Sequence, residues 1–237
     1  MAESEEAGAR EAFRLMAGGQ AACARAVDAE VTMTIATPWQ SGSMAGYLQL
    51  MAPGYLKFVG VNPLGQPLLI TGTDGETGSY VVPAERKIYQ GPLSAEAVLR
   101  YLPTGLDPTR SYYWLIGRLR PGQLSIMEVA GDLDRAGLWV EFRYEGEVRR
   151  ELALFDPLRL LLRRHLLLDE QGEVAFEVEY DSYSTGECPL PGLVTIRGDR
   201  RYGHLLLRLD NWLPAETLTG DDFKITVPSD FTRIHIK

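Results

Sequence analysis

The residues that could carry chemistry are few and lie far apart in the sequence. His165 and His204 each lie in an apolar, strand-like stretch, where a histidine is more often structural than a general base. Asp132 and Asp134 flank a predicted turn, a usual place for solvated carboxylates. The glycine-rich stretch 72–78 joins two predicted strands, so it is better explained as a turn than as a phosphate-binding loop. We therefore predict no enzymatic activity, no metal site and no cofactor.

The two cysteines, Cys23 and Cys188, leave two alternatives open. They can form a disulfide in an oxidising compartment, or each can be a small buried side chain. The three histidines are scattered, so no ligand spacing typical of a metal site is present.

The net charge argues against two kinds of binding, to nucleic acid and to an anionic bilayer by charge alone. The chain has 24 Lys and Arg against 32 Asp and Glu, a net charge of −8. Nucleic-acid binding needs clustered basic residues, and adhesion to an anionic bilayer by charge alone needs the same. The first six residues are acidic and lack the apolar core of a signal peptide. Both a cytoplasmic protein and a mature exported protein fit such a start.

A helix is predicted at the N-terminus. Ser4 can cap it, and acidic residues follow in the first turn. Residues then recur at spacings of three and four, which predicts one helical stripe that runs on to Val27. The members of the stripe are Phe13, Met16, Gln20, Cys23 and Val27.

Short strands follow, because apolar and polar residues alternate between Gly, Asp and Pro turns. They are expected at about 31–35, 44–50, 55–71 (a pair), 79–82, 87–90, 124–131, 137–145, 148–155, 159–168, 173–181, 191–198, 203–212 and 222–227. The leucine-rich segment 159–168 fits a helix or a strand by periodicity, and the turn after it favours a strand. Two short helices, starting at Ser94 and Asp107, interrupt the strands.

An antiparallel sheet of this size tends to curl and needs a cover on its concave face. We therefore predict one domain over residues 1–237. It is mainly β: an unclosed antiparallel barrel of about 11 strands, with the N-terminal helix and a short helical lid over the concave face.

The loop around Leu64 is a candidate contact site. Pro63 and Pro67 bracket it, and Gly65 allows a sharp turn. A leucine at such a position either folds back onto its own protein or is held outward to touch a membrane or an acyl chain. Because the loop can hold the side chain outward at low entropic cost, we predict that Leu64 is exposed.

Four segments, in order along the chain, resemble the LolA/LolB superfamily of lipoprotein-handling proteins, and LolB in particular. They are Tyr55-Leu56-Lys57-Phe58 with Asn62-Pro63-Leu64-Gly65, Trp114-Leu115-Ile116-Gly117, Leu190-Pro191 with Val194-Thr195-Ile196, and Leu207-Arg208-Leu209-Asp210-Asn211-Trp212. Asn62 stands where the family usually has Ser.

This resemblance implies an unclosed barrel with a helical lid that binds acyl chains of lipoproteins or other lipids and assists their transfer to the outer membrane. A soluble lipoprotein carrier and the outer-membrane surface are the implied partners. Leu64 is the implied transfer residue. The implied location is the periplasmic face of the outer membrane, with a lipid anchor on a segment preceding this sequence. By strand parity, the candidate lining residues are Met33, Ile35, Leu48, Leu50, Leu56 and Phe58, with Trp114 and Leu115 from the lid.

The chain departs from the LolB pattern beyond Trp212, where it continues to the end as LolA-like chains do. An alternative function therefore stays open: a non-catalytic structural or protein-interaction module at the periplasmic face of the outer membrane. A filled interior would favour this alternative.

Overall fold

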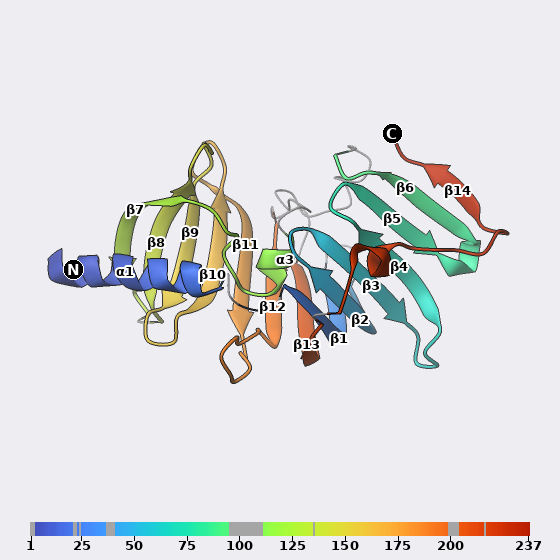
Figure 1. Cartoon of the computed structure of the whole chain (residues 1–237), viewed down its shortest axis with the longest axis horizontal. Coiled ribbons are helices and arrows are strands. Elements are labelled where there is room, and N and C mark those ends of the chain that lie inside the picture. Colours follow the sequence, from blue (N-terminus) through green and yellow to red (C-terminus); the bar gives the residue numbers. More distant parts are fainter. Residues whose placement is uncertain are drawn as a thin grey trace.

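A computed structural model describes residues 3–20, 23, 25–36, 41–94, 111–134, 136–198, 204–215 and 217–237. Its strands form one unclosed sheet of 14 strands, in the order β14-β6-β5-β4-β3-β2-β1-β13-β12-β11-β10-β9-β8-β7 (Figure 1). Neighbours pair antiparallel except for β14 and β6, which are parallel. The predicted fold class is confirmed, with 14 strands in place of about 11.

The bounds of the elements are α1 Glu3–Gly19, β1 Ala26–Ala36, β2 Ser41–Met51, β3 Tyr55–Val61, β4 Pro67–Thr73, β5 Thr77–Val82, η2 Pro83–Glu85, β6 Lys87–Pro92, α3 Ser111–Leu115, β7 Leu124–Gly131, β8 Leu138–Tyr144, β9 Glu151–Asp156, β10 Leu161–Leu168, β11 Val174–Asp181, β12 Leu193–Arg197, β13 His204–Pro214, η4 Gly220–Phe223 and β14 Thr232–His235. The ambiguous segment 159–168 is therefore a strand, as favoured. The predicted strand 148–155 begins only at Glu151.

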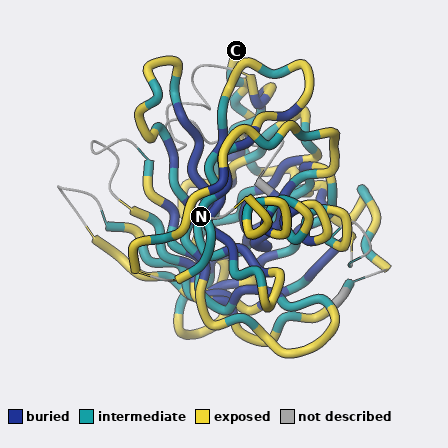
Figure 2. The backbone as a smooth tube through the Cα atoms, turned by 90° about the vertical axis from the view of Figure 1, so that its left-hand side faces the viewer, coloured by how far each residue is buried: buried dark blue, intermediate teal, exposed yellow. Residues whose placement is uncertain are grey.

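One face of the sheet, here called the inner face, carries the hydrophobic core. Alternate residues of neighbouring strands meet on it, as period-two alternation requires. Examples across the sheet are Phe58, Leu48, Val31, Leu207, Val194, Val178, Ala153 and Val140. Figure 2 shows buried residues along the strands, while the turns and most of α1 are exposed.

Helix α1 lies across the inner face of the β7–β11 region (Figure 1). Its buried residues, Ala9, Phe13 and Met16, follow the predicted spacing. The ring of Phe13 packs on Phe142 and Phe155, with centroids 5.3 and 5.4 Å away.

The prediction that the helical stripe continues to Val27 is wrong. The helix ends at Gly19, and Val27 pairs with Leu50 in the sheet. Gly18 and Gly19 have low helix propensity, and Val27 is better buried within the sheet.

The helical lid is described only in its last part, α3. The predicted helix start at Asp107, and all but the first residue of the helix predicted from Ser94, fall in residues 95–110, outside the described part of the chain. Trp114 and Leu115 on α3 are buried in the core.

The predicted strand 222–227 is wrong. A capping box between Thr219 and Asp222 starts the short helix η4, and the chain then crosses the outer face of β3 and β4 (Figure 1). Phe223 packs on Tyr55 with centroids 5.3 Å apart, and Lys57 donates to the carbonyl of Asp222 at 2.7 Å. These residues cover the sheet instead of extending it. The chain joins the sheet only further on, as β14.

Cys23 and Cys188 form a disulfide. It ties the stretch between α1 and β1 to the loop between β11 and β12. This bond excludes the alternative of two separate buried thiols.

Candidate functional site

The lining residues predicted on β1–β3 lie on one face but differ in exposure. Leu48, Leu50 and Phe58 are buried in the core. Met33 and Leu56 are partly buried and pack against the core, while Ile35, at the end of β1, is 42% exposed. The predicted set therefore runs from the core out to solvent along one apolar surface.

The two residues predicted from the lid, Trp114 and Leu115, are buried in the core. Trp114 packs on Phe176 of β11, with centroids 4.7 Å apart, and edge-on to His165 of β10. The structure thus places Trp114 over the β7–β11 region, while its helix α3 also contacts β3, the strand that carries Leu56 and Phe58. Leu115 is buried in the same core cluster as Leu48 and Phe58.

Three apolar residues that were not predicted extend this surface: Met44, Leu69 and Leu205. All are partly buried and pack against the core. Met44 pairs directly with Met33, and Leu69 pairs with Gly60. Met44 could have been found from the alternation of β2, which places it on the face of Leu48 and Leu50. Including Leu69 and Leu205 required knowledge of the strand order.

The loop between β3 and β4 holds Leu64 outward, with 83% of its surface exposed, as predicted. The Asn62 side chain accepts hydrogen bonds from the backbone N–H of Leu64 (2.9 Å) and of Gln66 (3.0 Å). Gly65 has a φ of +76°, which favours glycine. The loop is thus a hydrogen-bonded turn. Ile35 lies at the same end of the sheet, because β1 ends there and β3 runs into the loop.

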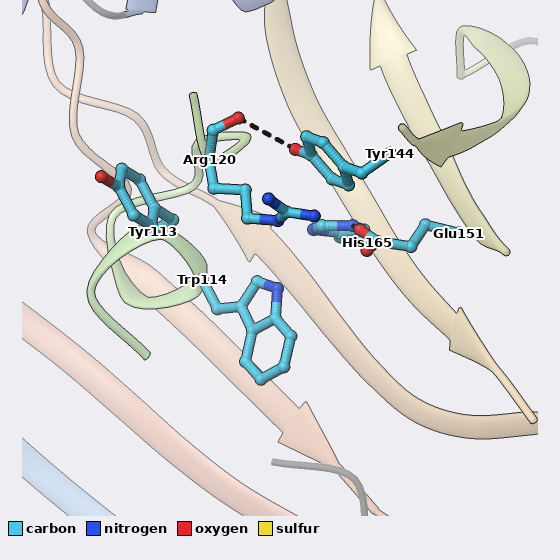
Figure 3. Close-up of a pocket in the computed structure, with 6 residues that line it drawn as sticks. All are labelled: Tyr113, Trp114, Arg120, Tyr144, Glu151 and His165. Carbon is cyan, nitrogen blue, oxygen red and sulfur yellow. Dashed lines mark hydrogen bonds and ion pairs between the residues drawn. The ribbon is translucent and has the colours of Figure 1, made fainter. Parts of the chain in front are cut away.

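A polar cluster lies on the inner face of the β7–β11 region (Figure 3). His165 Nε2 and a Glu151 carboxylate oxygen are 2.7 Å apart, and both side chains are almost fully buried. The Arg120 guanidinium lies over the Tyr144 ring, 3.4 Å from its centroid, and forms an ion pair with Glu147. The space between these residues is about 10 Å³, room for one water molecule. The cluster is too tightly enclosed to hold a lipid or an organic substrate as it stands.

A larger groove of about 450 Å³ lies near the ends of β9–β12 and is polar. Its walls include Asp132, Asp134, Arg163, Arg164 and Glu179. The arginines are already paired, Arg163 with Asp156 at 3.3 Å and Arg164 with Glu177. Such a surface suits a polar partner better than an acyl chain.

Among the described residues, no group of three or more His, Cys, Asp or Glu is placed to hold a metal ion. In the same part of the chain, no helix has the length and apolar character needed to cross a membrane.

No protein-family model and no curated protein sequence matches the chain. Solved structures do match its fold. A DUF1329 family protein from Desulfovibrio piger superposes with a TM-score of 0.64 at 10% identity, covering 92% of this chain and 97% of the other. A LolA superfamily protein from Nitrosomonas europaea gives 0.61 at 10% identity, with the same coverage.

A domain from Vibrio parahaemolyticus, named for outer-membrane lipoprotein sorting, gives a TM-score of 0.60 at 8% identity. It covers 93% of this chain and 96% of its own. Each likeness extends over nearly the whole of both chains. The chain therefore has the fold of LolA/LolB-like proteins.

Proposed function

We propose that this protein binds acyl chains of lipoproteins or other lipids on the inner face of β1–β4 and assists their transfer to the outer membrane. The observation that carries the proposal is the apolar inner surface, which continues from the core through Met33, Met44 and Leu69 to the exposed end at Ile35. Leu64 lies on a loop at that same end.

The energetics favour a long apolar ligand. Each buried methylene contributes about 0.8 kcal/mol, so a chain that buries ten of them gains roughly 8 kcal/mol before the entropy lost on binding is subtracted. The surface from Leu56 to Ile35 runs along several strands, which suits an extended chain. The proposed activity is binding without catalysis.

The cell envelope is the proposed location, at the periplasmic face of the outer membrane. The disulfide between Cys23 and Cys188 supports an oxidising compartment. The structural neighbours named for the LolA superfamily and for lipoprotein sorting support the same location by their names. The soluble carrier as donor and the lipid anchor stay predictions from the resemblance.

Direct binding tests the proposal. Purified protein is titrated with a fluorescent long-chain fatty acid, and gently extracted protein is weighed by native mass spectrometry. We expect saturable uptake of the probe and adducts of lipid mass. Absence of both would overturn the proposal.

A second experiment tests the transfer role of Leu64. We expect Leu64→Glu to leave the melting temperature nearly unchanged, because the side chain is already exposed. The same change should weaken association with zwitterionic vesicles and delivery of bound probe, since a leucine contributes roughly 1.5–3 kcal/mol when it is buried.

Leu133→Glu is the matched control, because Leu133 is 98% exposed on the turn between β7 and β8. Equal losses in the two variants would mean that exposed leucines contribute to binding regardless of position. No loss in Leu64→Glu would mean that the loop is only a connection.

The alternative, a protein-interaction module, has its own support in the polar groove of about 450 Å³. Its size and mixed charge suit a polar partner surface. A protein that fails to take up the fatty acid but retains a specific protein partner through Arg163 or Glu179 would favour this function.

A further inference from the structure

Two glycines lie opposite each other on the inner face of the β1–β4 region. Gly46 of β2 pairs directly with Gly60 of β3. A glycine weakens a strand because it has no side chain to pack, and it commonly marks a place where other atoms approach the backbone closely. The pair therefore leaves a strip of backbone across β2 and β3 that carries no side chain of its own, here called the strip.

Side chains of the same two strands lie in this strip. A Cβ built on Gly60 would be 2.0 Å from the sulfur of Met44. One built on Gly46 would be 2.4 Å from the backbone oxygen of Val59 and 2.7 Å from Cε2 of Phe58. Any residue other than glycine would push these atoms away. The Met44 thioether and the Phe58 ring thus rest directly on the backbone of the strip.

The two side chains that lie over the strip, Phe58 and Met44, differ in how deeply they are buried. Phe58 is 5% exposed and belongs to the core cluster. Met44 is only partly buried and packs at the margin of that cluster. Methionine is unbranched and adapts to irregular space, so the atom lying over Gly60 belongs to a side chain that can move.

We propose that the strip over Gly60 is an acyl-chain subsite, which Met44 occupies until cargo arrives and then leaves. The inference rests on the proposed function and locates one point of contact within it. The Met44 thioether has about the width of an alkyl chain, so a chain can take its place on the glycine backbone.

The surroundings of the strip fit an uncharged apolar ligand. Gly46 is flanked on the inner face by Val31, and Gly60 is flanked by Leu69. Both neighbours are apolar, and Leu69 is partly exposed. The strip also lies on the apolar surface that leads to the exposed end near Leu64.

Opposite effects of two substitutions test the subsite. Gly60→Ala fills the strip. The nearest atom is the sulfur of the flexible Met44 side chain, and the nearest atom outside Met44 is Cε1 of Phe58 at 3.2 Å, which has to shift by only a few tenths of an ångström. We expect about tenfold weaker binding of the fluorescent fatty acid, the effect of losing contacts worth about two methylenes. Met44→Ala empties the strip, and we expect binding about threefold or more tighter, because no side chain must be displaced.

Gly42→Ala is the matched control. Gly42 lies in β2 as well, but a Cβ there has nothing within 4 Å, so we expect unchanged affinity. Because Met44→Ala adds no atoms, its result remains informative even if Gly60→Ala lowers stability.

A spectroscopic measurement follows Met44 itself. With methionine methyl groups labelled with ¹³C, the fatty acid should shift the Met44 resonance and leave that of Met127, which lies on β7, in place. Two outcomes would overturn the subsite where the wild type still binds the fatty acid. One is a Met44 signal that does not move, and the other is a Met44→Ala variant that binds as weakly as Gly60→Ala. Failure of the wild type to bind would instead overturn the proposed function, and the subsite with it.

Discussion

The inner face of the sheet differs between its two regions. Over β7–β11, α1 places Phe13 between Phe142 and Phe155, and all three rings are fully buried. Over β1–β4, Met33, Met44 and Leu69 remain partly exposed. The strands alternate in the same way in both regions. The difference shows that an apolar strand face becomes fully buried core or stays partly exposed according to what covers it.

On the outer face of the sheet, the covered part lies at β3 and β4, and the part at β9–β12 is polar. Over β3 and β4, Phe223 and the chain that follows it cover the sheet. Over β9–β12, the outer face carries ion pairs such as that of Arg197 with Glu179, 2.7 Å apart. The segment around Phe223 thus covers the outer face at β3 and β4, whereas α1 covers the inner face at β7–β11.

Removing the ring that fills the β7–β11 region should have the largest effect on stability. We expect Phe13→Ala to lower the free energy of unfolding by about 3–5 kcal/mol, the usual loss for a buried phenylalanine. Met33→Ala, in the other region, should lose less than about 1.5 kcal/mol, because its side chain is only partly buried. Urea unfolding measures both. Equal losses would mean that the two regions are equally well packed.

The disulfide joins the stretch before β1 to the loop after β11, and so links the two regions. The double change Cys23→Ser with Cys188→Ser should lower the free energy of unfolding by roughly 2–4 kcal/mol, since 165 residues separate the cysteines. Reduced wild-type protein should unfold like the double variant in the same urea titration. A loss near zero would mean that packing alone holds the regions together.

Polar groups on the inner face should also respond differently. His165→Leu removes a hydrogen-bond partner from the buried Glu151 carboxylate, and we expect a loss of about 1–3 kcal/mol. Thr71→Val removes a hydroxyl that donates to the Ser79 carbonyl at 3.1 Å in the less buried region. Its loss should stay below about 1 kcal/mol. A larger loss at Thr71, again by urea unfolding, would contradict the comparison.

The smallest effect concerns acid stability. Burial raises the pKa of Asp156, but hydrogen bonds from the N–H of Arg159 and Leu158 and from Arg163 outweigh it, and the net pKa lies below the usual value. The stability it contributes is therefore complete above its unfolded pKa of about 3.9 and is lost as the pH falls through the lower folded value.

Asp156→Asn should accordingly lower the melting temperature by about 1–2 °C at pH 7 and have less effect near pH 2. Asp222 in the other region also has a lowered pKa, caused first by the backbone N–H of Thr219. Because Asp222 is fully exposed, Asp222→Asn should change the pH profile less. The reverse order in thermal melts from pH 2 to 7 would contradict this assignment.

Part of this organisation could be predicted from the sequence. Alternation at Val31, Met33 and Ile35 marked a strand and placed their side chains on one face. The proline-bounded loop predicted an exposed Leu64, which the structure confirms. Such features depend on residues within a few positions of each other, so local physics suffices for them.

Other features were predicted wrongly because a distant segment competes for the same residues. Val27 continues the helical spacing but gains more by pairing with Leu50 in the sheet. Residues 222–227 resemble a strand, yet Phe223 instead packs on Tyr55 of β3. The Thr219–Asp222 capping box was present in the sequence as a local signal for η4.

By itself, therefore, the sequence determined the strand pattern, the mainly β class and which side chains share a face, because the backbone geometry of a strand sets all three. Only the tertiary structure decided which of those faces α1 fills and which stays partly exposed. It also decided that Gly46 meets Gly60 with Met44 and Phe58 lying across them. These outcomes depend on register and on packing between segments distant in the chain, and no local spacing encodes either.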